Sequence, residues 1–534
     1  MTQTVFELLT AAALAAPDNV AIHYGNDTLS WRELEGAARR AAAGFSSLGI
    51  REGDRIAFWL PNTPAYLIAY FASTQLGAIA VAVNTRYRAK EVADIVSRSG
   101  AKTMILWPNF RGIDFLTILE EIPPTALERL ETLILYSEGP QQPDVPRLIQ
   151  GKPVRSWEEL TDMAPYMYDK GTPIHGCNMF TTSGTTSAPK FVLHNQRSIV
   201  AHANELWSNM ATLVGDGALL QTLPFCGVFG FTSIMLAVAG QKPMIISSAF
   251  DAAETVRLVD EHQISYFSAT DDMVMAMLAA DPRPKAMPGL TAIGFGAFNA
   301  SPEELAERAA ARGVCLVGLY GMSEVMALYA RRSADDPPEA RIQGGGKLIS
   351  PDAEVRVREP DSGILCAHGE KGELEIRGPS LMTGYFENEA ATSTAFTEDG
   401  FLKTGDLGFT TSQSEFTYVT RMGDTLRLGG FLVSPVEIEA HLAEHETVAG
   451  AQVVSVRVGD AIRAYAFIVG ARRQEVSTMT LDSHCRASLA RFKVPIAFHV
   501  LDAFPKTKGA NGTKIQRARL REIAQTAVDR GGNQ

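Results

Sequence analysis

Short apolar runs alternate with stretches of helical spacing in the N-terminal part of the chain. The runs Ile56–Leu60, Ala78–Val83 and Thr103–Leu106 have the length and composition of buried strands. Upstream of them, Ser30 and Glu33 form a capping-box pattern that predicts the start of a helix. Repetition of strand, helix and strand predicts a mostly parallel sheet covered by helices, which is an α/β fold.

The last part of the chain has a pattern of its own. Ser434–Glu437 carries the serine, proline and glutamate signals of a helix start. Strand-like runs follow at Ala451–Val458 and Arg463–Val469, and a helical pattern lies near Leu481–Ala490. These elements predict a separate α+β domain whose size is usual for one domain.

Between these regions, Glu354–Arg358 and Glu373–Arg377 alternate polar and apolar residues with a period of two, which predicts a small β-rich subdomain. The chain has 534 residues, which is too long for one simple core. We therefore expect a large α/β N-terminal body over residues 1–423, with mixed or parallel sheets, helices and the small β subdomain. A smaller α+β C-terminal domain is expected over residues 424–534.

Composition and charge exclude several classes of protein. Hydrophobic residues make up 46% of the chain and charged residues 20%, which excludes disordered, collagen-like and coiled-coil chains. The 49 basic and 60 acidic residues give a net charge of −11. Such a chain is not expected to bind nucleic acid or an anionic membrane, although a local basic pocket can still hold an anionic cofactor. No apolar run reaches the about 18 residues that a membrane span needs.

The five cysteines are scattered and lack C-x-x-C spacing, so we expect no disulfide framework or zinc site and a reducing, cytoplasmic location. The ten histidines show no metal-ligand spacing either. Near the start, Ala11–Ala16 is apolar, but Thr4 and Glu7 form a capping-box pattern and no basic segment precedes them. This favours a helix of the folded protein over a signal peptide.

A segment rich in hydroxyl groups, Thr181–Lys190, follows the apolar residues Met179 and Phe180. Its hydroxyls, its glycine and its terminal lysine are groups that bind phosphate oxygens, although the Walker A spacing is absent. A Ser/Thr-rich surface loop has the same composition, so composition alone leaves both interpretations open. The candidate phosphate-binding residues are Thr182, Ser183, Gly184, Thr185, Thr186 and Lys190.

Further motifs carry candidate chemistry. Tyr320–Glu324 combines an aromatic ring that can stack on a base with a carboxylate that can hold Mg²⁺. Asp406 follows a glycine in a turn, where its carboxylate can accept hydrogen bonds from ribose hydroxyl groups. Arg421–Asp424 stands where two patterns of the chain meet, and Lys514 follows glycine-bearing residues that suit a mobile cation. Singly, each motif is also an ordinary turn or loop.

Together, in this order and at these separations, the motifs resemble those of the adenylate-forming superfamily of acyl-CoA synthetases, adenylation domains and luciferases. The resemblance extends from about Phe6 to Arg521. It implies an enzyme that activates a carboxylic acid with Mg-ATP, releases pyrophosphate, holds an acyl-adenylate and passes the acyl group to a thiol. The physical requirement is electrostatic: one anion attacks another, so the site must supply preorganised cations.

The resemblance also implies a role for each site residue. Lys514, Glu324, Thr185 and Lys190 would be catalytic, with Glu324 binding Mg²⁺ and Lys514 bridging the substrate carboxylate and the α-phosphate. The residues that bind ATP or AMP would be Thr182–Thr186 and Lys190 at the β- and γ-phosphates, Gly296, Ala297, Phe298, Tyr320 and Gly321 at the adenine, Met322 and Ser323 beside them with Ser323 near the α-phosphate, and Asp406 and Arg421 at the ribose.

Two further features follow from the same resemblance. Asp424 would be the hinge at which the C-terminal domain rotates after adenylation, which withdraws Lys514 and brings in Gly429 and Gly430. The family typically carries His or another aromatic residue where Gly227 stands. Gly227 widens the pocket for a ring or branched acid, or one of Phe225, Phe229 and Phe231 fills the same volume. The residues expected at the acyl pocket and thiol tunnel are Phe225, Gly227, Phe229, Gly296, Gly429 and Gly430.

Other positions depart from the family pattern. Ser187 and Phe191 replace both glycines of the usual Thr-Gly-x-Pro-Lys-Gly, which removes freedom at positive φ and is expected to stiffen the loop. Asn195-Gln196 stand where the family often has Thr-His, and Gly423 replaces the Lys before the hinge. The changes in and after the loop are expected to slow ATP turnover, and they prompt the alternative of a non-catalytic protein that binds a nucleotide or an acyl-adenylate.

We therefore expect an ATP-dependent acyl-CoA synthetase for an aromatic, alicyclic or medium-chain acid, with ATP, Mg²⁺ and CoA as cofactors. CoA is favoured because no segment of carrier-domain size follows Arg521. The alternatives are a stand-alone adenylating enzyme that loads a carrier protein, the non-catalytic binding protein and, more remotely, a luciferase-like oxygenase. The expected partners are the acid and CoA, without nucleic acid or a membrane span, and a homodimer is one candidate assembly.

Overall fold

The structure, a computed structural model, separates the chain into two compact units. The N-terminal unit comprises Met1–Gly296, Pro302–Glu354 and Arg377–Gly400, and the C-terminal unit comprises Ala297–Ser301, Val355–Ile376 and Phe401–Gln534. The expected domain boundary at residues 423 and 424 lies outside the described residues and stays a prediction. The structure describes residues 3–138, 147–181, 190–296, 302–360, 362–422, 426–428, 431–433, 435–459, 461–471, 476–489, 493–509 and 512–531.

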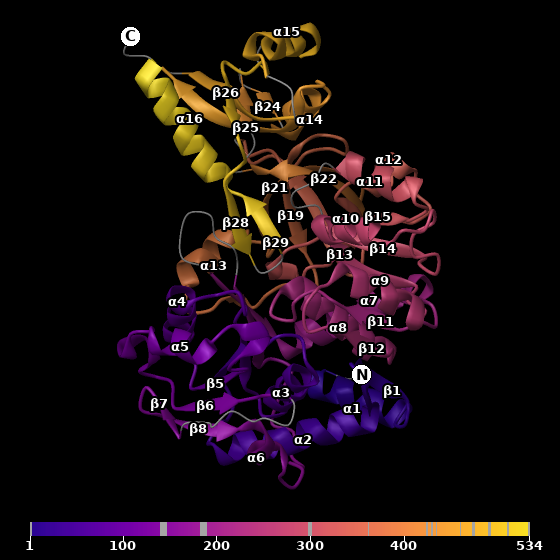
Figure 1. Cartoon of the computed structure of the whole chain (residues 1–534), viewed down its shortest axis with the longest axis vertical. Coiled ribbons are helices and arrows are strands. Elements are labelled where there is room, and N and C mark those ends of the chain that lie inside the picture. The colour runs from indigo at the N-terminus through magenta and orange to yellow at the C-terminus, as the bar shows by residue number, and fades with distance from the viewer. Residues whose placement is uncertain are drawn as a thin grey trace. The chain divides into compact units, whose positions relative to one another are not determined.

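The largest sheet of the N-terminal unit has the strand order β20-β10-β9-β4-β3-β5-β6-β8-β7. Four of its strands, β5, β6, β7 and β8, are labelled in Figure 1. Its central strands β4, β3, β5 and β6 pair in parallel, as the alternation of strand and helix predicts. Strands β9, β10 and β20 pair antiparallel at one end. The strands are β3 Arg55–Trp59, β4 Ile79–Ala82, β5 Thr103–Leu106, β6 Thr132–Leu135, β7 Leu148–Ile149, β8 Lys152–Ser156, β9 Gly176–Thr181, β10 Phe191–Asn195 and β20 Gly384–Tyr385.

Helices cover both faces of this sheet. Successive residues of β3 belong to different hydrophobic clusters: Phe58 packs with one and Trp59 with the other, and both side chains are fully buried. Each such burial contributes roughly 1.5–3 kcal/mol. The first cluster involves α1 Val5–Ala15, α2 Trp31–Ser47, α3 Pro64–Gln75, α6 Trp157–Thr161, α7 Gln196–Val214 and α8 Val228–Gly240; the second involves α4 Ala89–Ser99, α5 Phe115–Glu120 and the 3₁₀ turns η1 Phe110–Gly112 and η2 Pro124–Leu127.

The expected capping boxes are confirmed at the starts of α1 and α2. Thr4 accepts a hydrogen bond from the Glu7 backbone while the Glu7 carboxylate accepts one from Thr4, and Ser30 and Glu33 do the same. Each box satisfies two backbone donors that the first turn of a helix leaves without a partner. Local sequence therefore defines where these helices begin.

The remaining elements of the N-terminal unit form a second sheet and an α/β segment that carries one of the motifs. The second sheet has the order β11-β12-β1-β2, and strands β13, β14 and β15 pair in parallel. The elements are β1 Val20–Tyr24, β2 Asp27–Ser30, β11 Leu219–Gln221, β12 Met244–Ile246, α9 Ala252–Glu261, β13 Tyr266–Thr270, α10 Asp271–Ala280, β14 Ala292–Gly296, α11 Pro302–Ala311, β15 Leu316–Tyr320, η3 Ser323–Val325, β16 Ala330–Arg331, α12 Pro338–Arg341, β17 Gly345–Leu348 and α13 Glu389–Ala395.

The C-terminal unit contains the α+β elements and also the β-rich segment, which was expected in the N-terminal body. Helix α15 begins at Thr478 rather than near Leu481, because the Ser477 hydroxyl accepts a hydrogen bond from the Thr480 backbone and caps the helix there. The elements are β18 Glu354–Arg358, β19 Gly372–Arg377, β21 Leu402–Ser412, β22 Glu415–Arg421, β23 Leu426–Leu428, β24 Phe431–Val433, α14 Pro435–Ala443, β25 Val448–Val458, β26 Ala461–Gly470, α15 Thr478–Ser488, β27 Phe498–Leu501, β28 Lys506–Gly509, β29 Gly512–Ile515 and α16 Arg517–Gly531.

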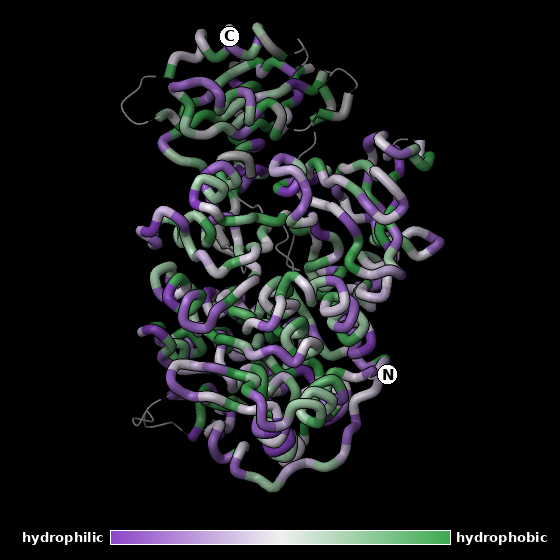
Figure 2. The backbone as a smooth tube through the Cα atoms, turned by 90° about the vertical axis from the view of Figure 1, so that its right-hand side faces the viewer, coloured by the Kyte–Doolittle hydropathy of each residue, from purple (hydrophilic) through white to green (hydrophobic). Residues whose placement is uncertain are grey.

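Hydrophobic and hydrophilic residues alternate along most of the backbone, as Figure 2 shows. This is the pattern of elements that bury one face against a neighbour. In the part of the chain that the structure describes, no helix is both long enough and apolar enough to cross a bilayer.

Candidate active site

The hydroxyl-rich segment joins two antiparallel strands of the large sheet. Strand β9 ends at Thr181 and β10 begins at Phe191, and these two residues are partners in the strand register. The segment is thus held at both ends by one hairpin. Of the expected phosphate-binding residues, Lys190 is described, whereas Thr182, Ser183, Gly184, Thr185, Thr186 and the departure Ser187 lie outside the described residues.

Lys190 stands directly before β10 and lies over the ring of Tyr385. Its Nζ atom is 4.5 Å from the ring centroid, which is within the range of a cation–π contact. Tyr385 comes from β20, which pairs antiparallel with β10, so that Val192 is the register partner of Tyr385. The sheet therefore brings together a lysine and a tyrosine that are far apart in the sequence.

Tyr320–Glu324 forms a tightly wound turn after β15. Only glycine fits at position 321, since a Cβ atom there would lie 1.2 Å from the carbonyl oxygen of Ala327. Met326 and Ala327 have positive φ angles of 59° and 66°, an uncommon conformation for residues other than glycine. The Thr232 hydroxyl donates to the Met326 carbonyl at 2.6 Å and holds this turn. Backbone strain of this kind is concentrated at functional sites.

Glu324, on η3, differs from other buried carboxylates of the chain. Its side chain is buried, and Tyr385 Oη donates a hydrogen bond of 2.9 Å to Glu324 Oε1. Within the described residues Glu324 forms no ion pair. By contrast, four other buried carboxylates each form an ion pair with an arginine: those of Asp281, Glu375, Asp406 and Glu439.

A buried carboxylate without a counter-charge is costly, and a bound cation removes that cost. Carboxylate oxygen is also the donor that Mg²⁺ prefers in proteins. The surroundings of Glu324 therefore fit the expected magnesium ligand. Bound there, Mg²⁺ would neutralise developing charge on phosphate oxygens.

His194 connects β10 to the turn that carries Glu324. Its Nε2 atom lies 2.8 Å from the Ser323 carbonyl oxygen, so Nε2 carries the proton and donates. The ring is fully buried, and this burial lowers the pKa of His194 to about 4, with a smaller contribution from His202. His194 is therefore a neutral ring at physiological pH, and it fixes the backbone next to Glu324.

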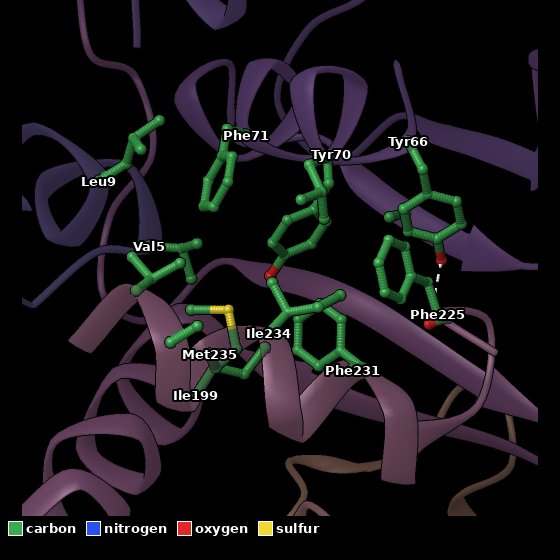
Figure 3. Close-up of a cluster of buried hydrophobic side chains, with 14 of the residues drawn as sticks. Val5, Leu9, Tyr66, Tyr70, Phe71, Ile199, Phe225, Phe231, Ile234 and Met235 are labelled. Atoms are coloured by element: carbon green, nitrogen blue, oxygen red, sulfur yellow. Dashed lines mark hydrogen bonds between the residues drawn. The ribbon is translucent and has the colours of Figure 1, made fainter. Parts of the chain in front are cut away.

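The residues expected at the acyl pocket lie around the start of α8. Gly227 is the N-cap of this helix, and Phe229 is buried in a core cluster. Phe225 is also buried, and its ring meets Tyr66 edge-on with centroids 5.5 Å apart (Figure 3). Burial raises the pKa of the Cys226 thiol to about 12, which keeps this cysteine protonated.

Asn62 fixes the backbone that precedes Gly227. Its side-chain amide donates 2.9 Å to the Leu223 carbonyl, and its carbonyl accepts 2.8 Å from the Phe225 backbone. Tyr66 Oη donates to the Phe225 carbonyl at 3.4 Å, the dashed line of Figure 3. The position of Gly227 is thus determined by side chains of α3 and its N-terminal loop.

In the C-terminal unit, Asp406 and Arg421 are register partners on β21 and β22. Arg421 Nη1 lies 2.7 Å from Asp406 Oδ1, with the aspartate buried and the arginine half-exposed. Gly405 and Asp406 lie within β21 and not in the expected turn; Gly405, with φ of 68°, stands at an irregularity of the strand register, and its backbone N–H donates 3.0 Å to Glu373. The structure therefore brings together the two residues expected at the ribose.

Gly296 ends β14 and is the register partner of Thr270. Tyr320 ends β15 and is buried, and Met322 caps η3. The backbone of Lys514 lies in β29, paired with Thr507. The remaining expected site residues, Ala297, Phe298, Asp424, Gly429 and Gly430, lie outside the described residues.

Comparison with known proteins agrees with this arrangement. The model of the AMP-binding enzyme family matches residues 9–386, and the model of the AMP-binding enzyme C-terminal domain matches residues 437–511. The chain belongs to the AMP-binding enzyme family. This confirms the resemblance to the adenylate-forming superfamily and the expected fold class.

Curated relatives extend over nearly the whole chain. The 4-coumarate–CoA ligase 5 of Oryza sativa subsp. japonica is 27% identical, over 93% of this chain and 89% of its own. The 2-succinylbenzoate–CoA ligase of Bacillus velezensis is 26% identical, over 96% of this chain and 97% of its own. ATP-bound MatB from Rhodopseudomonas palustris shares the fold, with a TM-score of 0.83 and 21% identity over 99% of this chain and 100% of its own.

Tyr385 and His194 are not among the site residues expected from the sequence. Tyr385 follows Gly384 in a strand of two residues, which is too short to show periodicity. His194 lies among apolar strand residues, where a polar residue at a buried position is the signal that a contact must satisfy it. Phe191, which stands where the family usually has glycine, fits into the structure. Its ring is buried in a core cluster, and the Arg98 guanidinium lies 4.5 Å from the ring centroid.

Proposed function

We propose that this member of the AMP-binding family is an ATP-dependent acyl-CoA synthetase. It activates an aromatic, alicyclic or medium-chain carboxylic acid as the acyl-adenylate, releases pyrophosphate and transfers the acyl group to CoA. The observation that carries the proposal is Glu324, a buried carboxylate without an ion pair within the described residues, held by Tyr385. The relatives named above as CoA ligases support transfer to CoA.

In the N-terminal unit, each of three residues has a separate role in the proposed reaction. Lys190 supplies a cation at the end of the hydroxyl-rich segment, against the ring of Tyr385. Tyr385 orients the Glu324 carboxylate, and His194 holds the backbone at Ser323. Rigid support of this kind reduces the reorganisation that is needed when an anionic carboxylate attacks a phosphate. In the C-terminal unit, the Arg421 contact orients the Asp406 carboxylate for ribose hydroxyl groups.

The test is a screen of carboxylic acids with ATP, Mg²⁺ and CoA, in which pyrophosphate and acyl-CoA are both measured. Acids of graded length and ring content identify the substrate class, and Glu324→Gln is the control for activity that depends on the site. Equal amounts of pyrophosphate and acyl-CoA are expected with the preferred acid. Pyrophosphate without acyl-CoA would point to a carrier protein as acceptor, and tight ATP binding without pyrophosphate release for any acid would favour a binding protein.

We further propose that Lys514 acts only in the first half-reaction. Lys514→Ala is expected to abolish formation of the adenylate and largely to spare thioester formation from supplied acyl-adenylate. Neighbouring Lys506→Ala, on the adjacent strand β28, is the matched control. An equal loss in both half-reactions would contradict rotation of a C-terminal domain at Asp424.

A further inference from the structure

A buried ion pair in the C-terminal unit lies beside the hairpin that carries Lys514. The backbone of Lys514 belongs to β29, and Arg517, three positions later, is the first residue of α16. Arg517 pairs with Glu439 of α14, which is 78 positions away in the sequence. The elements α14, α16 and β29 are labelled in Figure 1. A contact at Arg517 therefore constrains the chain close to where β29 ends.

The two charged groups meet at two points. Arg517 Nη1 lies 2.8 Å from Glu439 Oε1, and Arg517 Nη2 donates 2.9 Å to Glu439 Oε2. Both side chains are largely buried, with 19% of the arginine and 10% of the glutamate exposed. A two-point contact between a guanidinium and a carboxylate adds geometric specificity to the attraction of the charges. The pair therefore defines the position of Arg517 and does not merely neutralise it.

Strand β25 holds both members of the pair. Arg517 Nη1 also donates 3.2 Å to the Val453 carbonyl, and Glu439 Oε1 accepts 2.7 Å from the Val453 backbone N–H. Val453 lies within β25 and is the register partner of Ala466 on β26. The start of α16 is thus fixed to a sheet of the C-terminal unit and to α14 at once.

The segment between this anchor and Lys514 is short and is itself held. The Gln516 backbone N–H donates 2.9 Å to the Pro505 carbonyl, close to the end of the β28–β29 hairpin. Ile515 packs against a hydrophobic cluster of the same unit. Because only these two residues, Ile515 and Gln516, separate Lys514 from Arg517, a displacement of Arg517 is passed to the backbone of Lys514 with little chain to absorb it.

We propose that Arg517, held by Glu439, is a positioning residue for Lys514 in adenylate formation. This rests on the proposed function, in which Lys514 bridges the substrate carboxylate and the α-phosphate. A misplacement of about 1 Å at a catalytic group can reduce the rate by about 100-fold. The anchor orders the backbone of Lys514 in advance, so less conformational freedom is lost when the lysine enters the site. Thioester formation does not use Lys514 in this scheme and should not depend on the anchor.

The experiment measures the two half-reactions separately in Arg517→Lys. Adenylate formation is followed as pyrophosphate released in a single turnover without CoA, and thioester formation as acyl-CoA made from supplied acyl-adenylate. Lysine keeps the positive charge beside Glu439 but lacks the planar fork that makes the two-point contact. We expect the rate of adenylate formation to fall about 10- to 100-fold, with little change in thioester formation.

Two further variants complete the design. Arg519→Lys is the matched control, because Arg519 lies on the same helix and its pair with Glu522 is exposed, at 62% and 66% of the two side chains. Both of its half-reactions should proceed as in the wild type. Glu439→Gln removes the charge from the other side of the anchor and should reproduce the selective loss of Arg517→Lys. Retained thioester formation shows in the same sample that each variant is folded.

Two results would overturn the positioning role while the proposed function stands. One is a rate of adenylate formation in Arg517→Lys equal to that of Arg519→Lys. The other is an equal loss of both half-reactions in Arg517→Lys and Glu439→Gln, which would make the pair a purely structural contact. By contrast, a wild type that releases no pyrophosphate with any acid would overturn the proposed function and the positioning role together.

Discussion

Two buried glutamates, one in each unit, have opposite electrostatic surroundings. Glu375 on β19 is 1% exposed and lies between Arg356 and Arg358 of β18, at 2.5 Å and 2.8 Å. Glu324 is 7% exposed, accepts from the neutral Tyr385 hydroxyl and forms no ion pair within the described residues. The first carboxylate is neutralised by arginines of the protein, whereas the second has no basic partner within the described residues. We interpret Glu375 as structural and Glu324 as functional.

The largest effect is expected from Glu324→Gln. The amide keeps the shape and the Tyr385 contact but loses the charge that is proposed to bind Mg²⁺. We expect kcat/KM for pyrophosphate release to fall about 10²–10³-fold, with a change in unfolding free energy below about 1 kcal/mol. Steady-state kinetics and urea unfolding measure the two quantities. A large loss of stability with unchanged kinetics would show that Glu324 is structural.

Glu375→Gln is the reciprocal change. It removes the negative charge that two partly buried guanidinium groups share and is expected to lower the unfolding free energy by about 3 kcal/mol, with unchanged kcat per folded molecule. The arginine side chains are 19% and 30% exposed, so solvent screens part of the loss. Urea unfolding measures the effect. Loss of catalysis without loss of stability would reverse the assignment of the two glutamates.

Acid is expected to destabilise the region around Glu324. Burial lowers the pKa of His202 to about 4, from 6.5 in the unfolded chain. Below pH 6.5 the unfolded state therefore binds a proton that the folded state rejects until about pH 4, and stability falls across this window. For one such histidine the loss is about 2 kcal/mol at pH 5.

His202→Gln should make the loss of stability between pH 7 and pH 5 smaller, as measured from denaturant midpoints at both values. His499→Gln, in the C-terminal unit, is the control. An unchanged dependence on pH in His202→Gln would contradict a neutral, buried His202 and weaken the same argument for His194.

A smaller loss of activity than that of Glu324→Gln is expected from Tyr385→Phe. The ring stays beneath Lys190, while the hydrogen bond to Glu324 is lost. A hydrogen bond to a charged group contributes about 1.5–3 kcal/mol, so kcat/KM for Mg-ATP should fall roughly 10- to 100-fold. Tyr329→Phe is the matched control, since that hydroxyl donates to the carbonyls of Glu354 and Arg377. Equal kinetics for the two variants would contradict the role of Tyr385.

Many helix starts and strands of this molecule can be predicted from local sequence. Three predictions are confirmed: the capping boxes at Thr4 and Ser30, the parallel strands around Ile56 and the period-two strand at Arg356. Each could be predicted because it depends on residues within one or two helical turns or on one strand. The motif at Tyr320 is also local, since Gly321 is required by a carbonyl six positions away.

Tertiary structure alone decided the partners of the chemically important groups. Tyr385 reaches Glu324 through the pairing of β20 with β10, His194 reaches Ser323 across 129 positions, and Arg517 meets Glu439 across 78. Sequence by itself thus determined many of the elements and the family, and it supplied most residues of the proposed site. Which charge is neutralised, and which is left for a ligand, depends on contacts between distant segments that no local pattern encodes.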